Sequence, residues 1–194
     1  MRVEDLTRPL KNSRILTVPN QLTFLRLGFL PFFIIALFSD RYDWALGILI
    51  AAGISDGLDG LLARGLNQKT PLGAYLDPIA DKLLMFSSYF VLALKGKIAW
   101  WITILVLGRD VILLTASAAI LVTVGYRPFP PSIWGKITTT LEILLVLLVI
   151  LLKVFPSNWL MLMQRTCSYL VAFFVVFSGL HYSIVVSRRL HAGG

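Results

Sequence analysis

Four aspartates stand close together in a chain that is otherwise apolar: Asp56, Asp59, Asp77 and Asp81. The first two are three positions apart and the last two are four apart, so on helices each pair shares one face. If the two helices form an antiparallel hairpin, all four carboxylates meet at one end of it. Carboxylate oxygens suit Mg²⁺ or Mn²⁺, and four of them can bridge two ions. The spacing therefore predicts a site for two divalent cations.

The energetic cost of these aspartates in a membrane supports the same prediction. On insertion scales an aspartate at mid-bilayer costs about 2.5–3.5 kcal/mol, so four facing lipid would cost roughly 10–14 kcal/mol. We expect them to face the interior of a helix bundle, where Arg64, Lys69 and Lys82 could pair with some of them. Divalent cations would neutralise them better. The alternative is a structural network of salt bridges near the membrane interface.

Glycines beside the aspartates need a reason, because glycine lowers helix propensity. Gly57 and Gly60 adjoin the first pair, and Gly73 lies four positions before Asp77. At Gly60 a neighbouring helix, or the flat base of a ligand, could approach the backbone closely. Plain helix packing is the other interpretation of each glycine.

The composition indicates an all-α integral membrane protein. The chain has 194 residues, of which 57% are hydrophobic and only 14% charged, and its mean hydropathy is +0.81. A soluble domain of this size would be nearer a quarter charged. The apolar runs predict six transmembrane helices, at about 20 residues each. The predicted spans are residues 21–39, 43–63, 77–94, 98–124, 133–154 and 159–187.

The same pattern divides the chain into two predicted parts. Residues 1–18 mix charges of both signs and are predicted to form a short amphipathic segment on the membrane surface, not a cleaved signal peptide. Residues 19–190 are predicted to form the six-helix membrane domain. With six spans, both termini lie on the same side of the membrane.

The distribution of positive charge predicts the orientation. With the N-terminus in the cytoplasm, thirteen of the 18 Lys and Arg residues fall on the cytoplasmic side and five on the other. This bias places both termini and the aspartate group in the cytoplasm. The net charge of +8 then matches cytoplasmic loops near anionic lipid headgroups, and we expect no nucleic-acid partner.

Two further cations could bind an anionic substrate. Arg109 falls within the fourth predicted span, where a cation is a candidate functional residue by default. Lys136 falls where the fifth span begins. Together they could form a phosphate-binding pocket beside the metal site. Alternatively, Arg109 pairs with Asp110 or with the aspartate group, and Lys136 extends its amine to the membrane surface.

The aspartate region can be written D-x-x-D-G-x-x-A-R-x8-G-x3-D-x3-D. Its members in this chain are Asp56, Asp59, Gly60, Ala63, Arg64, Gly73, Asp77 and Asp81. This pattern resembles the signature of the CDP-alcohol phosphatidyltransferase family, and every fixed position matches. The segments "VPNQLTFLRL" and "LDPIADK" agree with it, so the resemblance covers about residues 15 to 185.

The resemblance implies a reaction and roles for these residues. Members of the family displace CMP from a CDP-linked lipid or alcohol with a second alcohol. Asp56, Asp59, Asp77 and Asp81 would hold two divalent cations, Mg²⁺ or Mn²⁺, against the pyrophosphate of CDP-diacylglycerol, and Asp81 would also be the general base. The residues expected to line the cytidine and phosphate pocket are Gly60, Ala63, Arg64 and Gly73. The family also implies a homodimer in a membrane, which we expect to be the bacterial inner membrane.

The acceptor stays open: glycerol 3-phosphate and phosphatidylglycerol are the two main alternatives, and inositol phosphate, serine and choline are further ones. "TVPNQLTFLRLGFLPFF" and "GKITTTLE" resemble phosphatidylglycerophosphate synthases, whose acceptor is glycerol 3-phosphate. Arg109-Asp110 followed by Val-Ile-Leu-Leu also resembles cardiolipin synthases, whose acceptor is phosphatidylglycerol. A function of another class, a divalent-cation transporter, fits less well, because the aspartates lie toward one face and no internal repeat is visible.

Overall fold

Six α-helices make up the part of the chain that the computed structural model describes, which is residues 18–66, 71–124 and 133–191. Side chains are described for residues 25, 27–55, 80, 82–115 and 133–180. The helices are α1 (Val18–Phe38), α2 (Tyr42–Leu66), α3 (Pro71–Leu94), α4 (Trp100–Val124), α5 (Ile133–Val154) and α6 (Asn158–His191). No strand occurs in these ranges, so the predicted all-α class is confirmed.

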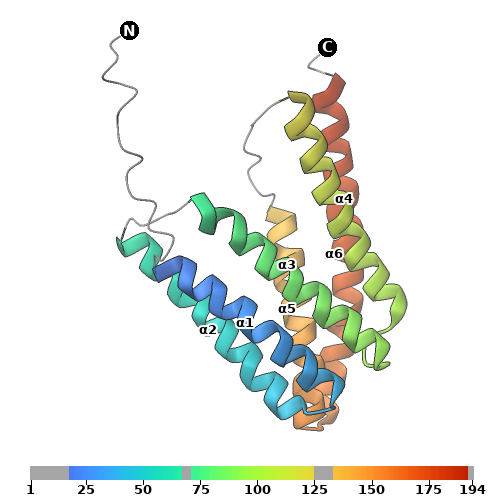
Figure 1. Cartoon of the computed structure of the whole chain (residues 1–194). Helices are drawn as coiled ribbons and strands as arrows, with labels where there is room; N and C mark the ends of the chain where they lie inside the picture. Colours follow the sequence, from blue (N-terminus) through green and yellow to red (C-terminus); the bar gives the residue numbers. More distant parts are fainter. Residues whose placement is uncertain (1–17, 67–70, 125–132, 192–194) are drawn as a thin grey trace.

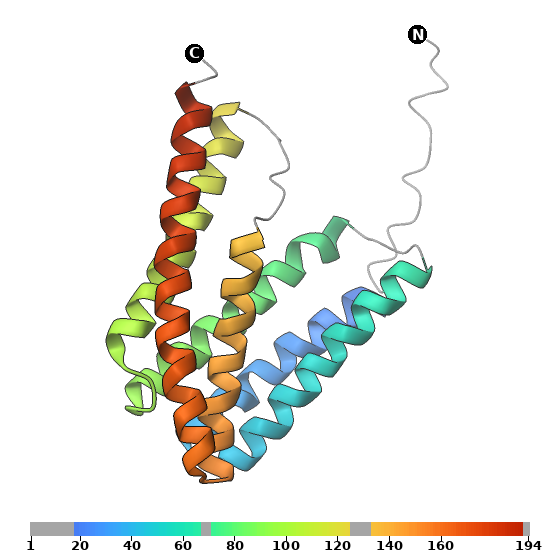
Figure 2. The same ribbon diagram turned by 180° about the vertical axis from the view of Figure 1, so that it is seen from behind.

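The helices form three antiparallel hairpins whose short connections lie at one end of the molecule. Figure 1 shows α1 joined to α2, α3 to α4 and α5 to α6 at the lower end, and Figure 2 shows the same from behind. The second half of α2 and the first half of α3 therefore rise toward the upper end, where α5 begins. These are the two segments that carry the four aspartates.

Two of the short connections use the same helix-ending turn. The amide of Arg41 donates to the carbonyl of Ala36 (2.9 Å) and that of Lys97 to the carbonyl of Leu92 (2.8 Å), a six-residue closure that requires a left-handed residue just before the donor. Asp40 (φ 55°) and Gly96 (φ 64°) supply it. The Lys95 amine, 2.7 Å from Asp40 Oδ2, ties the two turns together.

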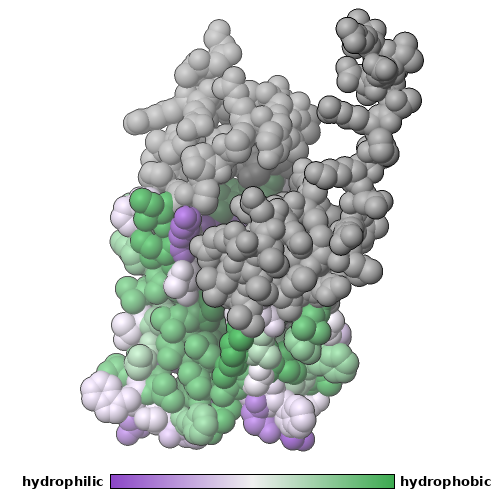
Figure 3. Space-filling view, turned by 90° about the vertical axis from the view of Figure 1, so that its left-hand side faces the viewer, coloured by the Kyte–Doolittle hydropathy of each residue, from purple (hydrophilic) through white to green (hydrophobic). Residues whose placement is uncertain are grey.

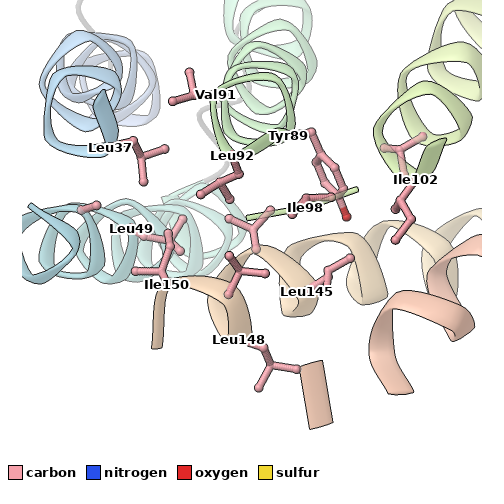
Figure 4. Close-up of a cluster of buried hydrophobic side chains, with 14 of the residues drawn as sticks. Leu37, Leu49, Tyr89, Val91, Leu92, Ile98, Ile102, Leu145, Leu148 and Ile150 are labelled. Atoms are coloured by element: carbon pink, nitrogen blue, oxygen red, sulfur yellow. The ribbon is translucent and has the colours of Figure 1, made fainter. Parts of the chain in front are cut away.

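The apolar core lies where α1, α2, α3 and α5 meet. Figure 4 shows Leu37, Leu49, Leu92 and Ile150 turned toward one another. These four side chains are almost fully buried, and each fully buried aliphatic side chain contributes roughly 1.5–3 kcal/mol. Helix α6 packs mainly on α5 and α4, so the sixth helix covers the side of the bundle away from α1 and α2.

The outer surface of the described helices is largely apolar. Large apolar side chains are exposed along the helices, among them Ile35, Ile104, Leu114 and Phe173. Figure 3 shows this apolar surface, with hydrophilic residues along the lower end and a further hydrophilic patch higher up. Two helical segments, Ile133–Val154 and Asn158–Leu180, are long and apolar enough to cross a bilayer, and most of each lies on the outside. The count of six spans stays a prediction.

Helix ends differ from the predicted spans around the aspartates. Residues 64–75 read as a polar break, whereas α2 continues to Leu66 and α3 already begins at Pro71. Hydropathy marks where the apolar run stops, but leucine, alanine and arginine continue a helix readily, and proline is favoured at a helix's first position. The predicted amphipathic segment 1–18 lies almost wholly outside the described residues and is not tested.

Candidate active site

The helical backbone confirms the spacing on which the aspartate prediction rests. Asp56 and Asp59 lie in the second half of α2, and Asp77 and Asp81 in the first half of α3. Each pair therefore shares a helix face. The four side chains lie outside the described ones, so their convergence on metal ions stays a prediction. Among the described residues, no group of three or more His, Cys, Asp or Glu could hold a metal.

The other motif residues fall on the same two stripes. Gly60 and Ala63 follow Asp56 at four and seven positions along α2, which is the spacing of one helix face. Gly73 precedes Asp77 by four positions along α3. Arg64 follows Asp56 at eight positions, which places it at the edge of the same α2 stripe. One face of each helix thus carries both the predicted metal ligands and the small residues of the predicted nucleotide pocket.

A network of charged side chains, buried at Arg109 and Asp110 and half-buried at Lys82, lies next to this region. Lys82, which directly follows Asp81, places its amine 2.5 Å from Asp110 Oδ2 in α4. Nη1 of Arg109 donates to the other oxygen of Asp110 at 2.8 Å. Nη2 of Arg109 donates to Oγ of Ser178 in α6 at 3.5 Å. The carboxylate of Asp110 therefore holds one cation on each oxygen and joins α3 to α4.

The burial of this network makes its pairing energetically important. Arg109 is 7% exposed and Asp110 9%, so both lie largely out of water. A buried charge that loses its partner destabilises a protein by about 3–5 kcal/mol. Nε of Arg109 is buried and has no hydrogen-bond partner among the described residues. The arginine is thus fixed by its two terminal nitrogens and keeps a donor unused.

A second acidic side chain lies in the same part of the bundle. Glu142 in α5 is fully buried, and its two carboxyl oxygens have no hydrogen-bond partner within the described part of the chain. Its carboxyl group lies near Lys82, Arg109 and Asp110. Four ionisable side chains from α3, α4 and α5 thus gather in one region.

A groove borders Arg109 on the outside of the bundle. It runs between α4 and α6, has a volume of about 320 Å³, and opens among exposed apolar side chains. A Cβ atom added at Gly108 would meet nothing within 4 Å, so the glycine leaves space at this wall. The lining residues include Ile104, Gly108, Arg109, Ile112, Val175 and Val176.

The sequence matches the CDP-alcohol phosphatidyltransferase family over residues 16–180, which is most of the chain. The chain belongs to this family. The matched region contains both aspartate stripes and the network around Asp110. The family assignment made from the eight signature positions is therefore confirmed.

Curated relatives in this family carry names for two acceptors. A putative cardiolipin synthase of Mycobacterium tuberculosis is 39% identical over 67% of this chain and 62% of its own length. A probable phosphatidylglycerophosphate synthase of the same organism is 38% identical over 67% and 64%. A CDP-diacylglycerol–glycerol-3-phosphate 3-phosphatidyltransferase of Aquifex aeolicus is 32% identical over 87% and 95%. The chain thus spans a little under two thirds of the length of the mycobacterial relatives.

The two predicted acceptor-binding residues, Arg109 and Lys136, lie in different surroundings. Arg109 pairs with Asp110, which is one of the alternatives that the sequence left open. Lys136 lies exposed in the first turn of α5 and forms no ion pair with any described residue. A shared phosphate pocket formed by the two stays a prediction.

Three residues gained importance only from the structure. The sequence offers Asp110 as a partner of Arg109 and as part of an Arg-Asp pair that resembles cardiolipin synthases, and Lys82 as a partner of the aspartate group. Glu142 is not among the predicted site residues, although a carboxylate in the middle of a span is a functional candidate by default. That default, together with Arg109 in the neighbouring span, is the signal that could have indicated a buried charge network.

Proposed function

We propose that this chain is a CDP-diacylglycerol-dependent phosphatidyltransferase that transfers the phosphatidyl group to glycerol 3-phosphate and releases CMP. The observation that carries the proposal is the pair of helix stripes on α2 and α3, which hold every signature position of the family. The Aquifex relative, whose name contains glycerol 3-phosphate, supports this acceptor, because the match covers 95% of that protein.

The donor set fits two divalent cations. Asp56, Asp59, Asp77 and Asp81 would hold Mg²⁺ or Mn²⁺, since four carboxylates supply only hard oxygen ligands. Such ions would neutralise the pyrophosphate of CDP-diacylglycerol. The nucleotide would lie against Gly60, Ala63, Arg64 and Gly73, where small residues permit close approach to the α2 and α3 backbone.

The chemical step needs a base and an oriented acceptor. Asp81 would accept the proton of the glycerol 3-phosphate hydroxyl as its oxygen attacks the phosphorus that carries diacylglycerol. The bond from that phosphorus to the CMP phosphate breaks, and CMP leaves with the electron pair. Arg109 and Lys136 would bind the acceptor's phosphate. Arg109 is suited to this role because its guanidinium is held in place and still has donors unused.

A second acceptor, phosphatidylglycerol, is favoured by the groove between α4 and α6. The groove is lined mainly by apolar side chains, borders Arg109 and opens on the membrane-facing surface. An acyl chain of a lipid acceptor fits such a groove, whereas glycerol 3-phosphate has no apolar part to place there. With this acceptor the product would be cardiolipin, and CMP would again be released.

The cellular setting follows from the sequence. We propose a six-span protein of the bacterial inner membrane, with its active site and both termini in the cytoplasm. Positive charge concentrated on that side supports the orientation. The homodimer is proposed on the family resemblance.

The test is a headgroup assay with purified protein. CDP-diacylglycerol and Mg²⁺ or Mn²⁺ are supplied with glycerol 3-phosphate, phosphatidylglycerol or inositol phosphate, and the lipid product and CMP are measured. We expect phosphatidylglycerophosphate, and none with Asp81→Asn, although this variant should still bind CDP-diacylglycerol in part. Failure to release CMP with any acceptor, combined with metal-ion flux into vesicles, would establish a transporter instead.

A further inference from the structure

We propose that Asp110 is a positioning residue: it fixes the guanidinium of Arg109 for the acceptor's phosphate and holds it in register with Asp81 through Lys82. The proposal rests on the proposed function, because it assumes that an acceptor phosphate binds Arg109. Asp110 itself would touch neither substrate nor metal.

The geometry gives each oxygen of Asp110 a separate task. Oδ2 contacts the amine of Lys82 at 2.5 Å, and Lys82 is the neighbour of Asp81 in α3. Oδ1 accepts from Nη1 of Arg109 at 2.8 Å. One carboxylate thus connects the helix of the predicted base to the predicted acceptor-binding residue. A change in the position of Asp110 would alter the distance between α3, which carries Asp81, and the guanidinium of Arg109.

Arg109 depends on Asp110 more than on its other partner. The contact of Nη2 with Ser178 is 3.5 Å long, at the limit for a hydrogen bond, whereas the contact with Asp110 is short and charge-assisted. An arginine has five N–H donors, and these two contacts use only two. The remaining donors, Nε among them, can serve an anionic oxygen while Asp110 keeps the guanidinium in place.

The partial exposure of Lys82 explains why Asp110 can hold two cations. Lys82 and Arg109 together carry one charge more than Asp110 can balance. The side chain of Lys82 is 37% exposed, so water also solvates its amine. Asp110 can therefore position Arg109 by its geometry as well as neutralise charge.

The first variant is Asp110→Asn, which keeps the shape of the side chain but replaces one oxygen with a group that cannot accept. We expect the acceptor KM to rise about tenfold to hundredfold, because hydrogen bonds to charged groups are worth that much. The KM for CDP-diacylglycerol should change little. Equal rises in both KM values, or no rise for the acceptor, would overturn the proposal.

A double variant separates positioning from charge balance. Lys82→Met/Asp110→Asn removes one cation and one anion together, so the formal charge of the buried cluster is unchanged. If Asp110 serves only to neutralise Lys82, the double variant regains the wild-type acceptor KM and melting temperature. If Asp110 positions Arg109, the melting temperature recovers and the acceptor KM stays raised.

A third variant keeps the experiment decisive if Asp110→Asn does not fold. Asp110→Glu retains the charge but moves the carboxylate by one methylene, and we again expect a raised acceptor KM. A folded Asp110→Glu enzyme with unchanged acceptor KM would overturn the proposal. The matched control is Asp43→Asn, an exposed aspartate that pairs with Arg41 at 3.4 Å at the opposite end of the bundle. It should leave both KM values unchanged.

The outcomes also distinguish the two proposals. If the wild-type protein releases no CMP with any acceptor, the proposed function fails. If it is active and the Asp110 variants behave like the Asp43 control, the proposed function stands and the positioning role fails.

Discussion

The hydroxyl of Tyr89 in α3 donates a hydrogen bond to the main-chain carbonyl of Glu142 in α5, at 3.1 Å. Both residues are completely buried. The bond crosses the centre of the bundle and fixes the height of α5 relative to α3. It therefore sets where the Glu142 carboxylate stands relative to Lys82 and Asp110.

Tyr89→Phe removes this bond and leaves the ring in place. We expect the free energy of unfolding to fall by about 1 kcal/mol, since a neutral hydrogen bond contributes that much. Unfolding by denaturant in detergent micelles measures the loss. Tyr169→Phe is the matched control, because Tyr169 is 60% exposed. Equal stability of the two variants would show that the bond contributes nothing.

The turn at Asp40 should make stability depend on pH at the acidic end. The hydrogen bond from Lys95, followed by that from Tyr42, lowers the pKa of Asp40 below its ordinary value of 3.8. A carboxylate with a lowered pKa stabilises the fold fully above its unfolded pKa, and the contribution is lost as pH falls through the folded pKa. The stabilisation by Asp40 is thus lost below about pH 4.

Asp40→Asn isolates that charge, because asparagine also tolerates the left-handed backbone found there. We expect the variant to melt below the wild type at pH 6, and the difference to shrink as pH falls below 3.8. Melting temperatures across this range, read by intrinsic tryptophan fluorescence, provide the comparison. A difference independent of pH would mean that the ion pair with Lys95 is not its cause.

The sequence was sufficient for the helices and for the family, because both depend on local patterns. Apolar runs mark the helices, and the spacing of Asp77 and Asp81 is a property of one helix. Hydropathy made the predicted break between α2 and α3 too long, because hydropathy does not measure the helix propensity of the residues around Arg64. The family signature was recognisable because its fixed positions all lie within two adjacent helices.

The pairing of Lys82 with Asp110 could not be predicted in the same way. It depends on how α3 is rotated and how far it is shifted along α4, which tertiary packing decides. A sequence shows that Lys82 follows Asp81 and suggests a partner among nearby aspartates. The structure instead directs the amine to another helix. The buried position of Glu142 is likewise a result of packing.

Metal dependence gives a direct test of the aspartate stripes. We expect chelation of divalent cations to abolish CMP release and Mg²⁺ or Mn²⁺ to restore it. Asp59→Asn should weaken Mn²⁺ binding by about tenfold or more, because even residues that only orient a metal ligand are worth 10–100-fold. Titration of Mn²⁺ followed by electron paramagnetic resonance measures this without turnover. Binding as tight as in the wild type would remove Asp59 from the metal site.

Gly108 offers a way to decide between the two acceptors. Gly108→Leu would place a side chain into the groove between α4 and α6, where an added Cβ has open space. If phosphatidylglycerol inserts an acyl chain there, the leucine would displace part of that chain. We then expect the KM for phosphatidylglycerol to rise about tenfold, which is the effect of removing a methylene group of a substrate from an apolar pocket. The KM for glycerol 3-phosphate should stay unchanged, because that acceptor does not reach the groove.

Gly47→Leu is the matched control for this prediction. Gly47 is exposed on α2, and a Cβ there also meets nothing within 4 Å, so the same substitution is made away from the groove. Lipid products formed from the two acceptors by wild type, Gly108→Leu and Gly47→Leu are compared at several acceptor concentrations. Selective loss of cardiolipin formation in Gly108→Leu would assign the groove to a lipid acceptor. A wild-type enzyme that uses only glycerol 3-phosphate, and is insensitive to both leucines, would show that the groove takes no part in acceptor binding.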